Sequence, residues 1–169
     1  MEIINKNLDD MLKDRTYTFT GKKDGYLLYS SDKHKTHKVI IYFTFDKVGV
    51  EFVKKTLAKT EDMEIDHIIL VSKEKLTPFA NKHILSVPTK MEIFLLDELK
   101  FNITKHYLVP KHVLLPHDES QKIIDYYGKK NLPQIRQVDI LSRYFDADIG
   151  QIFRIYRNEG GIYYRMIVT

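Results

Sequence analysis

The stretch KVIIYFTFDKVGVEFVKKTLAKTEDMEIDHIILVS, residues 38–72, decides the fold of the first half of the chain. It opens with a run of β-branched and aromatic residues and closes with the short apolar run HIILVS, and both are typical of strands. Between them, Val50, Val53 and Leu57 stand at helical spacing. This order predicts a β-α-β unit with parallel strands and a right-handed crossover.

The sequence downstream extends this unit by one helix and one strand. The segment TPFANKHIL, residues 77–85, begins like a helix, because Thr77 can cap a free N–H and Pro78 loses no hydrogen bond at the first helical position. MEIFLL, residues 91–96, predicts a further strand. The pattern as a whole predicts β-α-β-α-β, with the apolar helix faces laid on the sheet.

The sequence upstream predicts a helix and one more strand. Apolar residues recur with a period near 3.6 in residues 1–12, which indicates a short amphipathic helix. GKKDG, residues 21–25, is expected to break the chain, and YLLYS, residues 26–30, predicts a strand. The polar loop SDKHKTH, residues 31–37, then leads into the strand that opens the β-α-β unit. The first half is therefore predicted to be a small sheet flanked by helices.

The second half mixes strands and helices differently. LVPKHVLL, residues 108–115, has strand character interrupted by a proline, and SQKIIDYYGKK, residues 120–130, indicates a helix that ends at its glycine. QIFRIYR, residues 151–157, and IYYRMIV, residues 162–168, alternate around the turn NEGG and predict a β-hairpin. We therefore predict an α/β (α+β) protein with two modules, residues 1–100 and 101–169.

Composition narrows the class of protein. The chain has 169 residues, of which 43% are apolar, and it contains no cysteine, which excludes disulfides and thiolate metal sites. Its net charge of +4 neither requires nor excludes a nucleic-acid partner. No apolar run approaches the roughly 18 residues of a membrane span. The polar opening MEIINKNLDD lacks the apolar stretch of a signal peptide, so we expect a soluble protein that is neither secreted nor membrane-bound.

A zinc site is one chemical hypothesis, because HYLVPKHVLLPHDES, residues 106–120, holds three histidines. Without cysteine, at least three ligands would have to converge from imidazoles and carboxylates, and the candidates are His106, His112, His117, Asp118 and Glu119. Two prolines break the spacing that would place these residues on one face. The HxxH pair His34 and His37 lies in a polar loop. We interpret all five histidines as ordinary residues and expect no metal.

A small metal-dependent nuclease is the alternative function. An acidic residue followed by Glu-x-Lys on a sheet can hold Mg²⁺ and a water beside a phosphate. Glu98 and Lys100 have this spacing, and Asp97 or Asp66 could be the partner. The competing interpretation is a solvated helix start after a strand. Gly-rich phosphate loops and the GxSxG elbow are missing from the sequence, so we expect no cofactor and no small-molecule substrate.

Four segments of the second half carry a family resemblance: FNITKHYLVPKHVLL, NLPQIRQVDILSRYF, IGQIFRIYR and YYRMIV. In this order and spacing they resemble the C-terminal module of the fifth-largest shared subunit of eukaryotic nuclear RNA polymerases, which has a small counterpart in the archaeal polymerase. The resemblance implies a short mixed sheet that docks on the largest subunit, with no catalytic residue and no metal. The interface residues that it implies are His106, Val109, Pro110, His112, Pro133, Arg143, Tyr144, Arg157 and Arg165.

The sequence departs from the family pattern at a few positions. Gln134 stands where the family usually has arginine, Ile140 where it has proline, and Asp146 where it has glycine. The turn NEGG is also shorter than the family's last hairpin turn. These departures concern single contacts.

Residues 37–100 resemble the N-terminal jaw of the eukaryotic subunit through KVIIYF, VGVEFVKK, HIILVS and LTPFANK. In the family the jaw reaches toward downstream DNA with a Thr-Pro-Ser-Ala turn near the duplex, and Phe79 departs from that turn. The DNA-proximal residues that the resemblance implies are Lys75, Thr77, Pro78 and Lys82. We expect the lysines to contact phosphates without reading bases, and Phe79 to pack back onto the jaw.

The sequence thus predicts a non-catalytic subunit of a multisubunit DNA-dependent RNA polymerase. Residues 1–100 would form a DNA-facing jaw and residues 101–169 an assembly module. The expected partners are the largest subunit, other polymerase subunits and downstream double-stranded DNA. A eukaryotic source places the protein in the nucleus. A large DNA virus with a shortened jaw is the alternative source, which places it in the virion or in a viral factory of the host cell.

Overall fold

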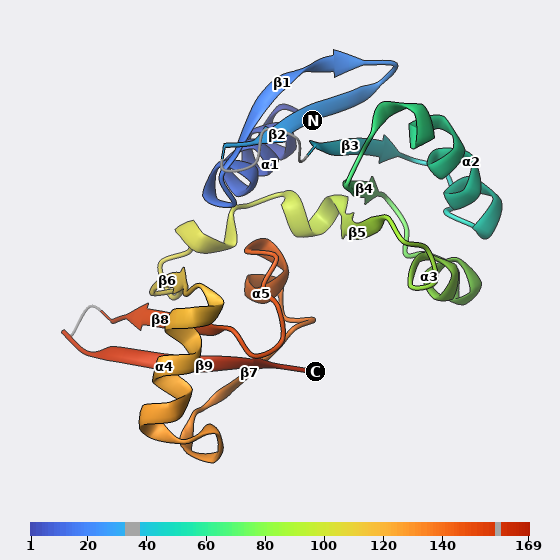
Figure 1. Cartoon of the computed structure of the whole chain (residues 1–169). Helices are drawn as coiled ribbons and strands as arrows, with labels where there is room; N and C mark the ends of the chain where they lie inside the picture. The colour runs from blue at the N-terminus through green and yellow to red at the C-terminus, as the bar shows by residue number, and fades with distance from the viewer. Residues whose placement is uncertain (33–37, 158–159) are drawn as a thin grey trace. The chain divides into compact units, whose positions relative to one another are not determined.

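The chain forms two compact units, Met1–Phe101 and Asn102–Thr169. The computed structural model describes residues 1–32, 38–157 and 160–169 (Figure 1). Each unit contains one sheet with helices packed on it, which confirms the predicted α/β (α+β) class. Among the described helices, none combines the length and the apolar character that crossing a bilayer requires.

The first unit is built on a five-stranded sheet in the order β1-β2-β3-β4-β5. β1 to β3 are antiparallel neighbours, and β3, β4 and β5 run parallel to one another. The predicted β-α-β-α-β order is therefore confirmed. The strands are β1 Tyr17–Lys23, β2 Tyr26–Ser31, β3 Lys38–Thr44, β4 His67–Ser72 and β5 Lys90–Leu95.

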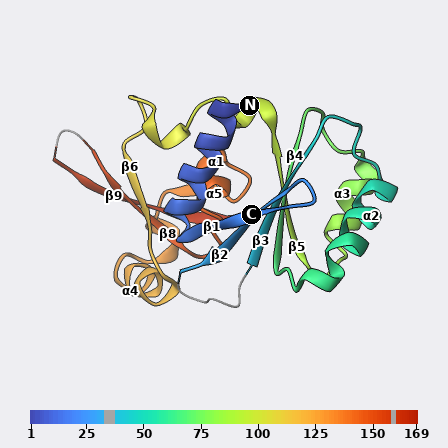
Figure 2. The same cartoon turned by 90° about the horizontal axis from the view of Figure 1, so that it is seen from above.

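Helices lie on both faces of this sheet (Figure 2). α2 (Val50–Thr60) and α3 (Pro78–Ile84) cover one face, and α1 (Glu2–Asp14) covers the other. Two short 3₁₀ turns, η1 (Glu61–Met63) and η2 (Leu96–Leu99), follow α2 and β5. Every residue of the interior strand β4 is buried, which explains why HIILVS is a continuous apolar run.

One core of the first unit lies between the sheet and the helices α2 and α3. Val53 from α2 and Ala80 and Ile84 from α3 pack on Leu70 of β4, with Val48 beside them. The helical spacing that the sequence shows therefore corresponds to one buried stripe on each helix.

The expected break at GKKDG was wrong, because most of that segment belongs to a strand. Gly21 and the two lysines after it lie in β1, which pairs with β2 in a hairpin. Only Asp24 and Gly25 form the turn, with φ of +50° and +86°. Two residues at positive φ are typical of a type I′ turn, whose twist matches that of the paired strands. The dipeptide Asp-Gly was therefore the signal of a hairpin.

A buried ion pair joins the end of α1 to the edge strand β5. The guanidinium of Arg15 donates to both carboxylate oxygens of Glu92, at 3.0 and 2.8 Å. His67 Nε2, at the start of β4, lies 2.8 Å from the same carboxylate, in a direction unfavourable for a hydrogen bond. Burial by itself would raise the pKa of Glu92, but Arg15 and then His67 hold that pKa well below its ordinary value.

We expect Glu92→Gln to lower the free energy of unfolding by about 3 kcal/mol at neutral pH, because Arg15 loses its buried partner. A depressed folded-state pKa adds stability above the ordinary value of about 4.3, and this stability is lost as the pH falls toward the folded-state pKa. The difference between wild type and variant should therefore shrink from pH 7 to pH 3.

Urea unfolding followed by circular dichroism at several pH values measures this difference. Glu64→Gln is the matched control, because the Glu64 side chain is 88% exposed and its contact with Lys38 at 3.4 Å is weak. A Glu92→Gln protein as stable as wild type at pH 7 contradicts the role given to the pair.

The second unit is built on a four-stranded mixed sheet in the order β6-β8-β9-β7. The predicted hairpin of β8 and β9 is confirmed, and β7 adds to β9 in parallel. The turn NEGG includes residues 158–159, which lie outside the described residues. The strands are β6 Lys111–Leu114, β7 Gln134–Arg136, β8 Ile152–Tyr156 and β9 Ile162–Val168, and the helices are α4 His117–Tyr127, α5 Ile140–Tyr144, η3 Ile103–Lys105 and η4 Lys129–Asn131.

The two faces of this sheet pack on different helices. Ile152 and Met166 face α4, which crosses the hairpin in Figure 1. Phe153, Ile155 and Ile167 belong to the opposite face, with Leu141 and Phe145 of the α5 segment packed on them. Because successive residues of a strand alternate between faces, each strand of the hairpin contributes to both cores.

The helix α5 is short and has a cap at its start. Asp139 Oδ1 accepts a hydrogen bond from the backbone N–H of Leu141 at 2.9 Å. The segment after the helix turns at Asp146, whose φ of +53° lies in the left-handed region. The glycine that the family pattern has here suits this backbone without strain, and the aspartate at this position adopts it nevertheless.

Candidate interaction groove

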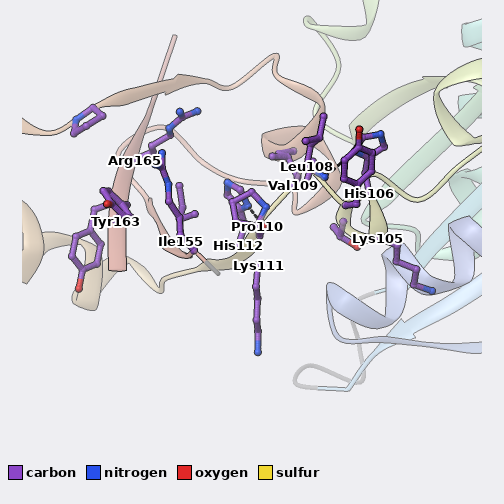
Figure 3. Close-up of a pocket in the computed structure, with 16 residues that line it drawn as sticks. Lys105, His106, Leu108, Val109, Pro110, Lys111, His112, Ile155, Tyr163 and Arg165 are labelled. Atoms are coloured by element: carbon purple, nitrogen blue, oxygen red, sulfur yellow. Dashed lines mark hydrogen bonds between the residues drawn. The ribbon is translucent and has the colours of Figure 1, made fainter. Parts of the chain in front are cut away.

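A groove of about 830 Å³ lies on the second unit (Figure 3). One wall is the segment 104–112, which runs through the start of β6. The floor and the other wall come from Ile155, Arg157 and residues 163–165 of the β8-β9 hairpin. Pro133 and Leu141 complete the lining.

The groove exists because α5 covers only part of its sheet face. The helix has five residues, whereas β9 has seven. Ile155 of β8 lies opposite Tyr163 of β9 and also opposite His112 of β6. Tyr163 is 47% exposed, so the helix does not close this end of the face.

The wall formed by residues 105–110 is shaped by local hydrogen bonds. The backbone N–H of Val109 donates to the carbonyl of His106 at 2.9 Å. The N–H of Leu108 donates to His106 Nδ1 at 3.3 Å. This tight turn presents Tyr107 and Leu108 outward, with 84% and 69% of their surface exposed. Large exposed apolar side chains next to a concave surface are typical of protein interaction sites.

His112 is fixed in one orientation within the groove. Its Nδ1 donates to the carbonyl of Pro110 at 2.7 Å, and its ring meets Phe153 edge-on with the ring centres 5.5 Å apart. Burial has the largest effect on the pKa of His112 and lowers it. The hydrogen bond to Pro110 raises this pKa, and the positive charge of Arg165 lowers it again. The imidazole is therefore neutral at pH 7, and its Nε2 is the nitrogen that accepts a hydrogen bond.

Arg157 and Tyr163 form a stacked pair at the open end of the groove. The guanidinium carbon lies 4.3 Å from the ring centre, which is cation–π geometry. Gly161 makes room for the ring, because a Cβ atom at this position would lie 2.6 Å from an edge carbon of Tyr163. The glycine therefore determines where the tyrosine and, through it, the arginine lie.

We expect Gly161→Ala to move the Tyr163 ring while leaving the unit folded. The clashing atoms belong to the far end of a half-exposed side chain, so the free energy of unfolding should change by less than about 0.5 kcal/mol. NMR should show that the aliphatic protons of Arg157 lose their ring-current shift. Tyr163→Phe, which keeps the ring, should retain that shift. An unchanged Arg157 signal in the alanine variant would show that the glycine does not position this pair.

The structure gathers most of the predicted interface residues into this groove, but not all of them. Arg143 and Tyr144 are outside its lining; Tyr144 is 5% exposed, and its hydroxyl accepts a hydrogen bond from Asn102 Nδ2 at 3.2 Å. Sequence reasoning did not assign Tyr107 or Tyr163 to the site. The predicted residues that line the groove are His106, Val109, Pro110, His112, Pro133, Arg157 and Arg165.

The histidines considered for a zinc site make separate contacts. The His106 ring stacks on Tyr107, His112 binds the carbonyl of its own strand, and His117 Nε2 lies 3.5 Å from Asp148. His34 and His37 lie outside the described residues. The contacts of the three described histidines are those of ordinary side chains.

The nuclease constellation is not assembled, which corrects that alternative. Asp66 precedes β4, whereas Asp97 follows the neighbouring parallel strand β5. The two carboxylates therefore lie at opposite ends of these strands, about 20 Å apart. Asp66 accepts from the backbone N–H of Lys38 at 2.9 Å. Glu98 accepts from the N–H of Leu95 at 2.8 Å, and Lys100 pairs with Asp97 at 2.6 Å. Glu98 and Lys100 therefore belong to a helical cap.

The predicted DNA-proximal residues lie around α3. Thr77 caps the helix, because its Oγ1 accepts from the N–H of Ala80 at 3.3 Å. Lys75 and Lys82 are exposed. Phe79 is 78% exposed, so the expectation that it packs back onto the jaw was wrong. It occupies the second helical position after proline, where its side chain projects from the first turn.

Comparison with known proteins agrees with the resemblance in the sequence. The family described as "RNA polymerase Rpb5, C-terminal domain" matches residues 101–167. The subunit RPABC1 of DNA-directed RNA polymerases I, II and III from Caenorhabditis elegans is 31% identical over 157 residues, covering 88% of this chain and 74% of that protein. The corresponding subunit from Dictyostelium discoideum is 31% identical over 173 residues, covering 91% and 88%.

A third relative is subunit 5A of DNA-directed RNA polymerase V from Arabidopsis thaliana, which is 34% identical over 136 residues, covering 78% of this chain and 61% of that protein. These matches define a class of accessory RNA polymerase subunits. The chain belongs to the RPABC1 (Rpb5) family of DNA-directed RNA polymerase subunits. The predicted family is therefore confirmed, and these relatives lend no support to a viral source.

Proposed function

We propose that this chain assembles into a multisubunit DNA-directed RNA polymerase as a non-catalytic subunit, with the unit Asn102–Thr169 docking on the largest subunit. The observation that carries the proposal is that the family match over residues 101–167 contains the whole groove. The relatives named as subunits of polymerases I, II and III support the nucleus as its location.

The surface of the groove suits a protein partner. It combines exposed apolar and aromatic side chains, Tyr107, Leu108 and Tyr163, with fixed polar groups such as His112 Nε2. Interfaces derive most of their binding energy from a few such side chains seated in concave, desolvated surroundings. Local hydrogen bonds already hold the wall in place, so little ordering remains to be done on binding.

We expect Tyr107→Ala combined with Leu108→Ala to reduce co-purification with the largest polymerase subunit at least about tenfold, because two exposed interface anchors are removed. The unit should remain folded, since both side chains are largely exposed.

Tyr126→Ala is the matched control, because Tyr126 is 81% exposed on α4 of the same unit and lies outside the groove. Affinity purification followed by mass spectrometry measures the yield. If the double variant recovers the largest subunit as well as wild type does, the groove is not the docking site.

For the unit Met1–Phe101, the proposed role is a jaw beside downstream DNA. The support is the exposed pair Lys75 and Lys82 around α3, on the segment that resembles the family's DNA-proximal turn. The helix start itself has little to offer a phosphate, since Thr77 already uses the amides of Ala80 and Asn81 and Pro78 has none. The lysines would therefore carry the contact.

Charge reversal of Lys75 and Lys82 to glutamate should shorten the lifetime of the open complex. The affinity of the polymerase for DNA should also depend less steeply on the salt concentration. Loss of two phosphate contacts lowers the slope of log affinity against log salt by about 1.8. The variant protein should still co-purify with the polymerase.

Reversal of Lys22 and Lys23, two exposed lysines on the β1-β2 hairpin of the same unit, provides the control. Transcription assays over a range of salt concentrations measure the effect. Equal salt dependence in the Lys75/Lys82 variant and in wild type would remove the DNA-facing role from this turn.

A further inference from the structure

The charged side chains that line the groove are all positive. Among the sixteen described residues that line it, none is acidic, whereas Lys105, Lys111, Arg157 and Arg165 are cationic. Lys111 points away from the other labelled side chains in Figure 3. His112 is neutral at pH 7, because burial lowers its pKa. Lys105 belongs to the wall of the groove. The charge that an occupant meets on the sheet face therefore comes from Arg157 and Arg165.

Strand register fixes the spacing of these arginines. Arg157 follows β8, and its N–H donates to the carbonyl of Gly161, which places the two residues opposite each other. Arg165 lies four residues further along β9, opposite Phe153. At about 3.3 Å per residue, the two arginines are separated by about 13 Å along the strand direction, on neighbouring strands and on one sheet face.

Within the described residues, no carboxylate of the chain occupies either guanidinium group. Arg157 and Arg165 are exposed, and no carboxylate in the described part of the chain forms an ion pair with either of them. The Arg157 guanidinium lies over the Tyr163 ring, a contact that uses none of its N–H groups on a carboxylate and restricts its position. A guanidinium fixed in this way binds a carboxylate through two parallel hydrogen bonds and with little loss of side-chain entropy.

Apolar side chains occupy the space between the charges and the wall. Ile155 lies between the levels of Arg157 and Arg165 in the hairpin, and Val109 and Pro110 line the same groove (Figure 3). A nucleic-acid backbone carries a charge at every residue and would place phosphates over this apolar surface. An extended peptide places an apolar side chain there and keeps its charges at the ends.

We propose that the groove holds an extended acidic segment of a partner polymerase subunit, with two carboxylates about four residues apart on Arg157 and Arg165 and an apolar side chain between them over Ile155. This inference rests on the proposed function, because it names the chemistry of the surface that docks here. The spacing follows from the rise of an extended chain, which equals that of β9.

Site-specific crosslinking tests the identity of the occupant. The full chain carrying p-benzoylphenylalanine at position 108 is assembled into polymerase, irradiated and digested, and the crosslinked segment is identified by mass spectrometry. We expect a polymerase-subunit segment with two Asp or Glu residues about four positions apart. A segment without carboxylates, a crosslink to nucleic acid, or no crosslink from a chain that co-purifies would each overturn the inference. If the wild-type chain does not co-purify with the polymerase either, the proposed function is contradicted instead.

Neutralising the arginines tests their role separately. Arg157→Gln combined with Arg165→Gln should weaken retention in the polymerase about tenfold at low salt and make it nearly independent of salt. Lys130→Gln combined with Arg136→Gln removes the same charge from exposed positions outside the groove and should behave like wild type. Replacing the crosslinked carboxylates with lysine should restore retention of a chain carrying Arg157→Glu and Arg165→Glu. Equal retention and equal salt dependence in the Arg157/Arg165 and Lys130/Arg136 variants would overturn the inference.

Discussion

The mismatch between a five-residue helix and a seven-residue strand determines what the second unit can do. A sheet face is normally buried against another layer along its whole length. Here α5 ends at Tyr144 after covering Phe153 and Ile167, and the rest of the face stays open. Directly after the turn at Asp146, Ala147 packs into the same core and the chain returns to the sheet in β8, so the open surface follows from the short length of the helix.

The first unit depends on a different constraint, the buried contact between Arg15 and Glu92. A carboxylate that is largely removed from water is stable only with a partner in good geometry, and the two-bond contact with Arg15 provides one. The contact ties the end of α1 to β5, which is the edge strand on the far side of the sheet from β1. It adds a directional interaction to the burial of Leu8, Met11 and Leu12 on α1, whereas α2 and α3 are held by apolar packing around Leu70.

Periodicity alone was sufficient for much of the fold. The parallel core around residues 38–72 was predictable, because a buried parallel strand and an amphipathic helix leave different apolar periods in the sequence. The hairpin of β1 was missed because GKKDG is polar, although the Asp-Gly pair carried the turn signal. β7 and α5 have three and five residues, which is too short for either period to emerge.

The groove could be predicted only in part, for a similar reason. The family resemblance indicated Pro110, His112, Arg157 and Arg165, and the structure places these residues together in the groove. It could not separate these from Tyr144, because family patterns mark packing residues and surface residues alike. The exposure of Tyr107 depends on a turn held by two local hydrogen bonds, and no periodic pattern encodes such a turn.

The distribution of satisfied and available polar groups separates binding from catalysis in this chain. The carboxylates that resembled a nuclease site are used within the fold, Asp66 by the N–H of Lys38 and Glu98 by that of Leu95. A catalytic carboxylate has to keep a lone pair for a metal or a proton in a shielded pocket. The arginines Arg157 and Arg165 have the opposite character, because they are exposed on a sheet and carry a positive charge. Groups of this kind are suited to recognising a partner, which is the chemistry that the proposed docking role requires.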